Sequence, residues 1–178
     1  LIATEVIVPA DFSSAAFFIV AASIVPGSDV ILENVGVNRT RNSMLKIMEL
    51  MGADIELQNA REQSGEPVAD IHIKSSDLQG IDIPEELVAV AIDEFPVILI
   101  AAACAKGTTR LSGAAELRVK ESDRIQSMLD GFLATGIEAE STEDGMILEG
   151  SKFKGGVVNS HGDHRIAMAF AVAGMVSK

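Results

Sequence analysis

A short charged run, RVKESDR from Arg118 to Arg124, holds the residue types best suited to chemistry in this chain. Its middle residues, ESD, are typical of the beginning of a helix. Lys120 and Arg124 are unfavourable there, because the first turn of a helix carries partial positive charge. Residues that break a local rule often mark a site. The run therefore predicts a helix N-terminus that binds a phosphate or carboxylate, with Lys120 and Arg124 on one face. The alternative is a solvated, self-paired surface helix.

The elements that must position this run repeat along the chain at a period of about 80 residues. Residues 13–32 and 94–111 each read as an apolar helix, a glycine turn and a short strand. A second helix and two further strands follow each of them. This predicts an α/β (α+β) fold of repeated βαβαββ units, with mixed sheets outside buried apolar helices. We expect unit one at 5–80, unit two at 81–150 and an incomplete unit three at 151–178.

Three helices, at 14–25, 95–105 and 165–176, are so apolar that we expect them to be buried on most faces and to form the centre of one domain. The 48% hydrophobic content is sufficient for such a core. The chain begins at Leu1 and ends directly after an apolar helix. We therefore expect a piece of a longer protein.

Composition argues against several functions. A net charge of −12 disfavours nucleic-acid and anionic-membrane binding, and the absence of Trp and Tyr disfavours base stacking. The longest apolar run, 15–25, is too short to cross a bilayer. The single cysteine, Cys104, lies in an apolar run without a cationic neighbour, which predicts a buried, inert thiol and a reducing, cytoplasmic location.

Equivalent helices of repeated units should point the same way, so their N-termini are expected to gather on one side. This brings together carboxylates, a lysine, two arginines and a histidine, a surface suited to a small phosphorylated molecule. The segments are 11–14, 92–94, 120–124 and 162–165. Simpler interpretations stay open: Asp11, Asp93 and Asp163 are good helix caps, and His164 alone is more often a packed or surface histidine. The sequence contains no HxxxH motif, no HExxH motif and no pair of cysteines, so it predicts no metal site.

Four segments together resemble the 5-enolpyruvylshikimate-3-phosphate (EPSP) synthase family. They are PADFSSAAFF (9–18), AIDEFPV (91–97), AKGTTRLSGAAELRVKESDRI (105–125) and GDHRIAMAFAVAG (162–174). Their order and spacing match along nearly the whole chain. The resemblance implies a two-domain enzyme that transfers the enolpyruvyl group of phosphoenolpyruvate to the 5-hydroxyl of 3-phosphoshikimate, without a metal or an organic cofactor. This chain resembles the C-terminal domain, so the N-terminal domain is an expected partner and the chain alone is expected to be inactive.

The resemblance also implies roles for single residues. Asp93 resembles the family's acid/base aspartate that meets the shikimate ring, and Glu121 the glutamate that shuttles the methylene proton. Lys120 resembles the 3-phosphoshikimate lysine. Arg124 and Arg165 resemble the two phosphoenolpyruvate-binding arginines, and His164 a histidine beside them. Some members have Asn at the position that Glu116 occupies in this chain. The chain therefore departs from those members at that substrate contact.

Two other functions remain open. One is an enolpyruvyl transferase that acts on UDP-N-acetylglucosamine, a family that shares the fold. The other is a non-catalytic domain that binds anions. Retention of Asp93 and Glu121 beside the cations favours an enzyme, because a binding module needs no paired acid/base carboxylates.

Overall fold

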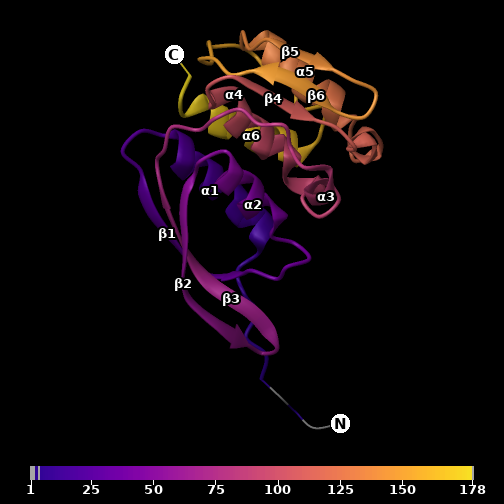
Figure 1. The fold of residues 1–178 in the computed structure, drawn as a ribbon. Coiled ribbons are helices and arrows are strands. Elements are labelled where there is room, and N and C mark those ends of the chain that lie inside the picture. The colour runs from indigo at the N-terminus through magenta and orange to yellow at the C-terminus, as the bar shows by residue number, and fades with distance from the viewer. Residues whose placement is uncertain (1–2, 4, 178) are drawn as a thin grey trace.

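The computed structural model describes residues 3 and 5–177 (Figure 1). Its helices are α1 (Phe12–Ile24), α2 (Ser43–Leu50), α3 (Glu85–Val88), α4 (Phe95–Cys104), α5 (Arg124–Ala134) and α6 (His164–Gly174), with the short 3₁₀ turns η1 (Ile92–Glu94) and η2 (Ala115–Val119). Its strands are β1 (Asp29–Gly36), β2 (Asp54–Gln63), β3 (Glu66–Lys74), β4 (Thr108–Leu111), β5 (Ala139–Ser141) and β6 (Met146–Glu149).

The strands form two sheets of three, with the orders β1-β3-β2 and β4-β6-β5. All pairs of named strands are antiparallel. Among the described residues, parallel pairing is confined to three isolated bridges, Ala10 with Val35, Gln79 with Lys106 and Asp82 with Arg110. The short segments before α1 and α4 thus act as the first strand of each βαβαββ unit. The predicted fold class is confirmed, and the mixed character of the sheets rests on these bridges.

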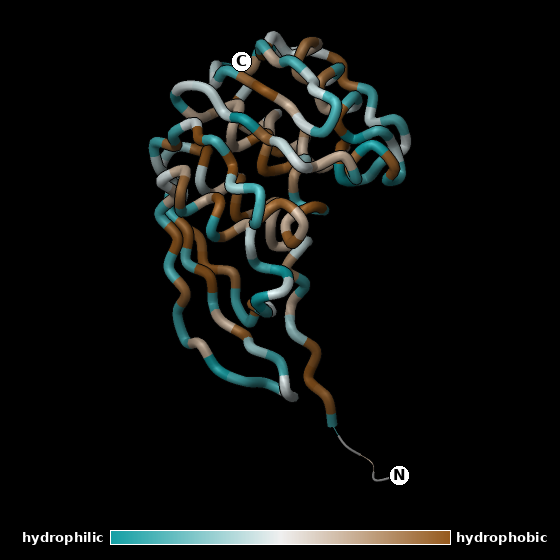
Figure 2. Tube along the Cα trace, turned by 45° about the vertical axis from the view of Figure 1, so that its right-hand side comes forward, coloured by the Kyte–Doolittle hydropathy of each residue, from teal (hydrophilic) through white to brown (hydrophobic). Residues whose placement is uncertain are grey.

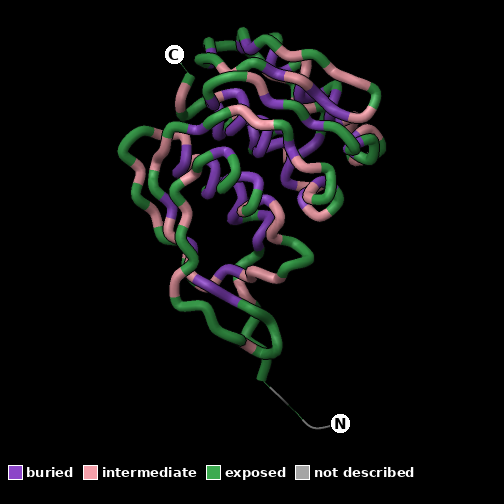
Figure 3. Tube along the Cα trace, in the orientation of Figure 1, coloured by how far each residue is buried: buried purple, intermediate pink, exposed green. Residues whose placement is uncertain are grey.

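Helices α1, α4 and α6 pack against one another beside the two sheets (Figure 1). Every residue of α4 from Phe95 to Ala103 is buried, as expected for the central helix of the three (Figure 3). The expectation of burial on most faces is wrong for α6, which buries Ile166, Ala169, Val172 and Ala173 and leaves Met168 exposed. Its inner face contacts α1, α4 and α5, whereas no element within residues 3 and 5–177 covers its outer face.

The segment before α1 extends away from the helices as an apolar stretch (Figure 2). Val6, Ile7 and Val8 are exposed along it, and the backbone N–H of Ile7 donates to Ser64 Oγ at the turn between β2 and β3. The chain then turns into α1 at Asp11, whose side chain accepts from the Ser14 backbone N–H at 2.8 Å. The prediction of a cap at Asp11 is confirmed. None of the described helices is both long and apolar enough to cross a membrane.

Candidate active site

The guanidinium of Arg124 is the centre of the predicted cluster of helix N-termini. Arg124 is the first residue of α5 and is 1% exposed. Its Nε donates to Asp163 Oδ2 at 2.8 Å, its Nη2 to Glu121 Oε2 at 2.5 Å and its Nη1 to Asp93 Oδ1 at 3.3 Å. The N-termini of α4, α5 and α6 therefore meet at one arginine, as the repeat predicted.

Lys120 reaches the same cluster from outside α5. The residues before it form η2, and its extended backbone separates η2 from α5, which begins only after its N-cap Asp123. The prediction that Lys120 lies in the first helical turn is therefore wrong, although its Nζ lies 3.6 Å from Asp93 Oδ1. A hydrogen bond to Glu116 at 2.5 Å, together with the charge of Asp93, raises the pKa of Lys120. Its ammonium stays charged over the physiological range.

Asp163 is both a helix cap and a buried ion-pair partner. Its Oδ1 accepts from the Arg165 backbone N–H at 2.9 Å and so caps α6, as predicted. The residue is fully buried, and its Oδ2 accepts from Arg124. Burial alone would raise the pKa of Asp163, but the hydrogen bonds from Arg124 and from the Arg165 amide outweigh it and lower the pKa. The carboxylate is thus ionised against a buried guanidinium.

Asp93 is not the cap of α4. It lies in η1, and the N-cap of α4 is Glu94, which is 4% exposed. The side chain of Asp93 is half exposed and lies between Lys120 and Arg124. The capping interpretation of Asp93 is therefore wrong, and its carboxylate is available at the surface of the cluster.

Arg165 completes the cluster from α6. Its Nη1 donates to the backbone oxygen of Asp93 at 2.8 Å and lies 3.5 Å from Glu94 Oε1. Burial raises the pKa of Glu94, although a hydrogen bond from Ser13 and the charge of Arg165 act in the opposite direction. Ser13 belongs to α1, so the first unit also contacts the cluster.

Five predicted site residues come together here: Asp93, Lys120, Glu121, Arg124 and Arg165. His164 is exposed at the first position of α6, and no hydrogen bond or ion pair links its side chain to another described residue, so its role stays a prediction. The first cation of the charged run, Arg118, serves the scaffold instead. It pairs with Asp123 at 2.8 Å and donates to the backbone oxygens of Thr142 and Glu143.

Sequence reasoning placed Glu94 and Asp163 among the gathered helix N-termini, but it missed that both are buried carboxylates paired with arginines. It assigned Asp163 a capping role only, and it assigned Glu94 none. The available signal was position, since both residues directly precede apolar helices whose N-termini were expected to meet. A carboxylate at such a place is buried as soon as the helices pack, and a buried charge requires a partner.

Carboxylates outnumber cations in the cluster. Lys120, Arg124 and Arg165 face five carboxylates, those of Asp93, Glu94, Glu116, Glu121 and Asp163. The unfavourable charge of Arg124 at a helix N-terminus is thus compensated from within the chain. This arrangement can hold two half-exposed carboxylates, Asp93 and Glu121, ready for proton transfer beside three cations.

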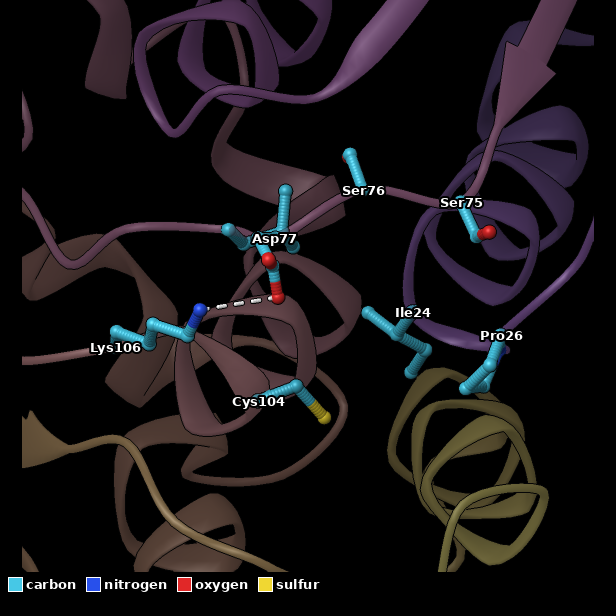
Figure 4. A pocket seen from close by; sticks show the side chains of 8 residues that line it. Ile24, Pro26, Ser75, Ser76, Asp77, Cys104 and Lys106 are labelled. Atoms are coloured by element: carbon cyan, nitrogen blue, oxygen red, sulfur yellow. Dashed lines mark ion pairs between the residues drawn. The ribbon is translucent and has the colours of Figure 1, made fainter.

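A cavity lies away from the cluster, at the C-terminal ends of α1 and α4 (Figure 4). It has a volume of about 360 Å³, and Ile24, Ser75, Cys104 and Lys106 are among its lining residues. Burial raises the pKa of Cys104 to about 12, which agrees with the predicted inert thiol, although the residue is only partly buried and not fully buried as expected. Lys106 is paired with Asp77 at 3.1 Å, and both side chains are exposed. This cavity has one carboxylate and one ammonium, which pair with each other, and it lacks the several carboxylates and cations that the helix N-termini bring together.

A smaller cavity adjoins the cluster. It has a volume of about 320 Å³ and is lined in part by Ser13, Arg41, Ile92, Asp93 and Glu94.

Over residues 3 and 5–177, no group of three or more His, Cys, Asp or Glu side chains is arranged to hold a metal ion. The chemistry that these residues offer is proton transfer and anion binding.

Comparison with solved structures first identifies the fold. The chain shares its fold with the enolpyruvyl transferase NikO from Streptomyces tendae, with a TM-score of 0.51 at 19% identity over 84% of this chain and 31% of that one. Within this fold, the model of the family EPSP synthase (3-phosphoshikimate 1-carboxyvinyltransferase) matches residues 1–178. The chain belongs to that family.

Individual members of this family are similar to nearly the whole chain. A 3-phosphoshikimate 1-carboxyvinyltransferase of Legionella pneumophila (strain Paris) is 60% identical over 174 residues, which are 98% of this chain and 40% of the relative. The structure of EPSP synthase from Acinetobacter baumannii superimposes with a TM-score of 0.94 at 56% identity and covers 96% of this chain and 40% of that one. The chain thus spans about 40% of the length of the relatives that it matches.

Proposed function

We propose that this chain is the C-terminal domain of an enzyme that transfers the enolpyruvyl group of phosphoenolpyruvate to the 5-hydroxyl of 3-phosphoshikimate, giving EPSP and phosphate. Units one (5–80) and two (81–150) and the incomplete unit three (151–178) form this domain in the proposal, and the enzyme is cytoplasmic. The observation that carries the activity is the meeting of Asp93 and Glu121 at the buried guanidinium of Arg124. Family membership supplies the substrates.

Each half of the reaction, addition and elimination, needs two proton transfers, and both halves need stable binding of anions. In the proposal, Asp93 accepts the proton of the attacking hydroxyl, and Glu121 donates a proton to the methylene carbon of phosphoenolpyruvate. The new C–O bond gives a tetrahedral intermediate. Elimination then returns a proton from the methyl group to Glu121 and breaks the C–O bond to phosphate, which leaves with the proton that Asp93 had accepted. Both carboxylates are about half exposed, which leaves them accessible to a substrate.

The cations divide between the two substrates in this proposal. Lys120 binds 3-phosphoshikimate, and Arg124 and Arg165 bind phosphoenolpyruvate, with His164 beside it. Pairing within the cluster keeps all three cations on one face before a substrate arrives, which supports positioning as their contribution.

The chain alone is proposed to be inactive. Two doubly or triply charged anions would enter a cluster in which carboxylates already outnumber cations, so further cations must come from a second domain. That the chain spans 40% of its relatives supports this division. Phosphate release above the blank by the purified chain alone would contradict it.

The activity is tested in a chimera. The matching 174-residue segment of the Legionella pneumophila relative is replaced by this chain. Phosphate release from phosphoenolpyruvate is then measured with 3-phosphoshikimate or UDP-N-acetylglucosamine as acceptor. Release with 3-phosphoshikimate only is expected. Release with the sugar nucleotide only would show that the proposed acceptor is wrong. Release with neither acceptor would favour an anion-binding domain.

The two carboxylates are tested separately in the same chimera. Asp93→Asn and Glu121→Gln are expected to lower turnover by about 100-fold or more while the Michaelis constants change little, because each removes a proton-transfer group and keeps the shape. The matched control is Glu140→Gln, which makes the same change on an exposed residue of β5. Raised Michaelis constants with unchanged turnover would assign Asp93 and Glu121 to positioning.

A further inference from the structure

Glu94 is a buried carboxylate beside the site that the proposed reaction does not use. It directly follows Asp93 and is the N-cap residue of α4, and it is 4% exposed. Its Oε1 accepts from Ser13 Oγ at 2.6 Å. Keeping a carboxylate in such a place costs free energy unless it has partners, so its contacts indicate its use.

The Ser13 hydroxyl is oriented toward Glu94. Ser13 is 8% exposed on α1, and its Oγ lies 3.5 Å from Arg41 Nη2, which donates to it. Because the oxygen accepts from Arg41, its own proton is free for Glu94. The carboxylate of unit two is therefore held by a hydroxyl of unit one, and its position is fixed relative to both helices.

The cation beside this carboxylate is Arg165. The Nη1 of Arg165 is 3.5 Å from Glu94 Oε1 and donates to the backbone oxygen of Asp93 at 2.8 Å. Within residues 3 and 5–177, Glu94 is the only carboxylate at ion-pair distance from the Arg165 side chain. Two consecutive residues of η1 thus hold one end of the guanidinium, one with a carbonyl and the other with a charge.

We propose that Glu94, oriented by Ser13, is the positioning residue that holds Arg165 in place for the carboxylate or phosphate of phosphoenolpyruvate. The inference rests on the proposed function, since it concerns the arginine assigned to that substrate. Glu94 acts through Arg165 and does not touch the substrate. A guanidinium fixed before binding loses less side-chain freedom when the anion arrives, which improves affinity without changing the chemical step.

The test is Glu94→Gln in the chimera with the Legionella pneumophila relative. Gln keeps the shape and still accepts from Ser13, but it removes the charge beside Arg165. The Michaelis constant for phosphoenolpyruvate is expected to rise about tenfold, which equals about 1.4 kcal/mol. Turnover and the constant for 3-phosphoshikimate are expected to stay within about twofold. An unchanged constant for phosphoenolpyruvate, or an equal rise for both substrates, would overturn the proposal.

A matched control is Glu149→Gln. Glu149 also accepts from a hydroxyl at 2.6 Å, that of Thr108, but it lies exposed on β6. This variant is expected to leave all three constants unchanged. A double-mutant cycle adds the arginine: with Arg165→Gln in place, which removes the cation that Glu94 faces, Glu94→Gln is expected to raise the constant for phosphoenolpyruvate by less than about twofold more. A full tenfold rise in that background would show that Glu94 acts independently of Arg165 and would overturn the proposal.

A measurement without turnover separates this inference from the proposed function. In ¹⁵N-labelled protein, the side-chain Nε–H signal of Arg165 is expected to show an ordered guanidinium in the parent and in Glu149→Gln, and a mobile one in Glu94→Gln. An Arg165 signal that does not respond to Glu94→Gln would overturn the positioning role. Absence of activity in the parent chimera, by contrast, would overturn the proposed function, and the Arg165 signal would still decide on Glu94.

Discussion

Replacing Asp163 by Ala should destabilise the chain more than the loss of any other helix cap in the cluster. The change removes the N-cap of α6 and the buried partner of Arg124 at 2.8 Å. Loss of a cap costs about 1 kcal/mol. Breaking a buried ion pair costs about 3–5 kcal/mol, because the remaining charge is left without compensation.

The lower end of that range applies here. Arg124 keeps Glu121 at 2.5 Å and Asp93 at 3.3 Å, so its charge is still partly compensated. We therefore expect Asp163→Ala to lower the free energy of unfolding by about 4 kcal/mol, against a total of about 5–15 kcal/mol for a typical domain. Asp163→Asn keeps a cap and loses only the charge, so it should fall between the parent and the alanine variant.

The assay is urea unfolding of the chain, followed by far-ultraviolet circular dichroism because the sequence has no Trp or Tyr. The matched control is Asp11→Ala, which removes the cap of α1, an exposed hydrogen bond from Ser14 Oγ at 2.9 Å and a weak, exposed contact with Arg41 at 3.7 Å, but no buried ion pair. It should cost about 1 kcal/mol. If Asp163→Ala costs no more than Asp11→Ala, the buried pair with Arg124 contributes nothing and the reasoning fails.

Three further changes test other parts of the structure. Arg124→Lys in the chimera should raise the Michaelis constant for phosphoenolpyruvate about tenfold or more, because Lys cannot reproduce a guanidinium fork; an unchanged constant would remove Arg124 from that site. Gly131→Ala should destabilise the chain by about 1–3 kcal/mol in urea unfolding, since a Cβ there meets the Phe170 ring at 2.2 Å, whereas the control Gly174→Ala has no atom within 4 Å and should be neutral or stabilising. Burial raises the pKa of Glu94 above its unfolded value, so its contribution to stability is present at acid pH and lost as pH rises through the folded pKa. Glu94→Gln should therefore gain stability relative to the parent as pH rises from about 4 to 7, and a loss over this range would contradict the direction of the shift.

The repeated arrangement of helices and strands and the meeting of the helix N-termini could be predicted from the sequence because both follow from periodic patterns. The apolar helix of residues 14–25 and the glycine turn after it are repeated at residues 95–105. Equivalent helices of a repeat point the same way. For residues 165–176, the apolar pattern predicted more burial than the structure shows. An apolar stretch shows that a helix can be buried, but its neighbours decide which faces are covered.

The hydrogen bonds and ion pairs within the site could not be predicted, because they join residues that are far apart in the sequence. Asp163 and Arg124 are separated by 39 residues and Ser13 and Glu94 by 81, and no local pattern links them. The position of Lys120 outside α5 depends on η2, a short 3₁₀ turn without a distinct sequence signal. Local rules correctly marked the charged run as unusual, but the compensation came from carboxylates distant in sequence.

The contacts of Arg124 divide its guanidinium into a fixed edge and an exchangeable edge. Its Nε faces Asp163, which is fully buried and cannot be displaced by a substrate. Its Nη1 and Nη2 face Asp93 and Glu121, whose side chains are 47% and 54% exposed. An incoming anion would therefore compete with these two carboxylates for the same nitrogens. On the proposed mechanism, binding phosphoenolpyruvate at Arg124 releases the acid and the base that the reaction needs, so anion binding and proton transfer are coupled through one side chain.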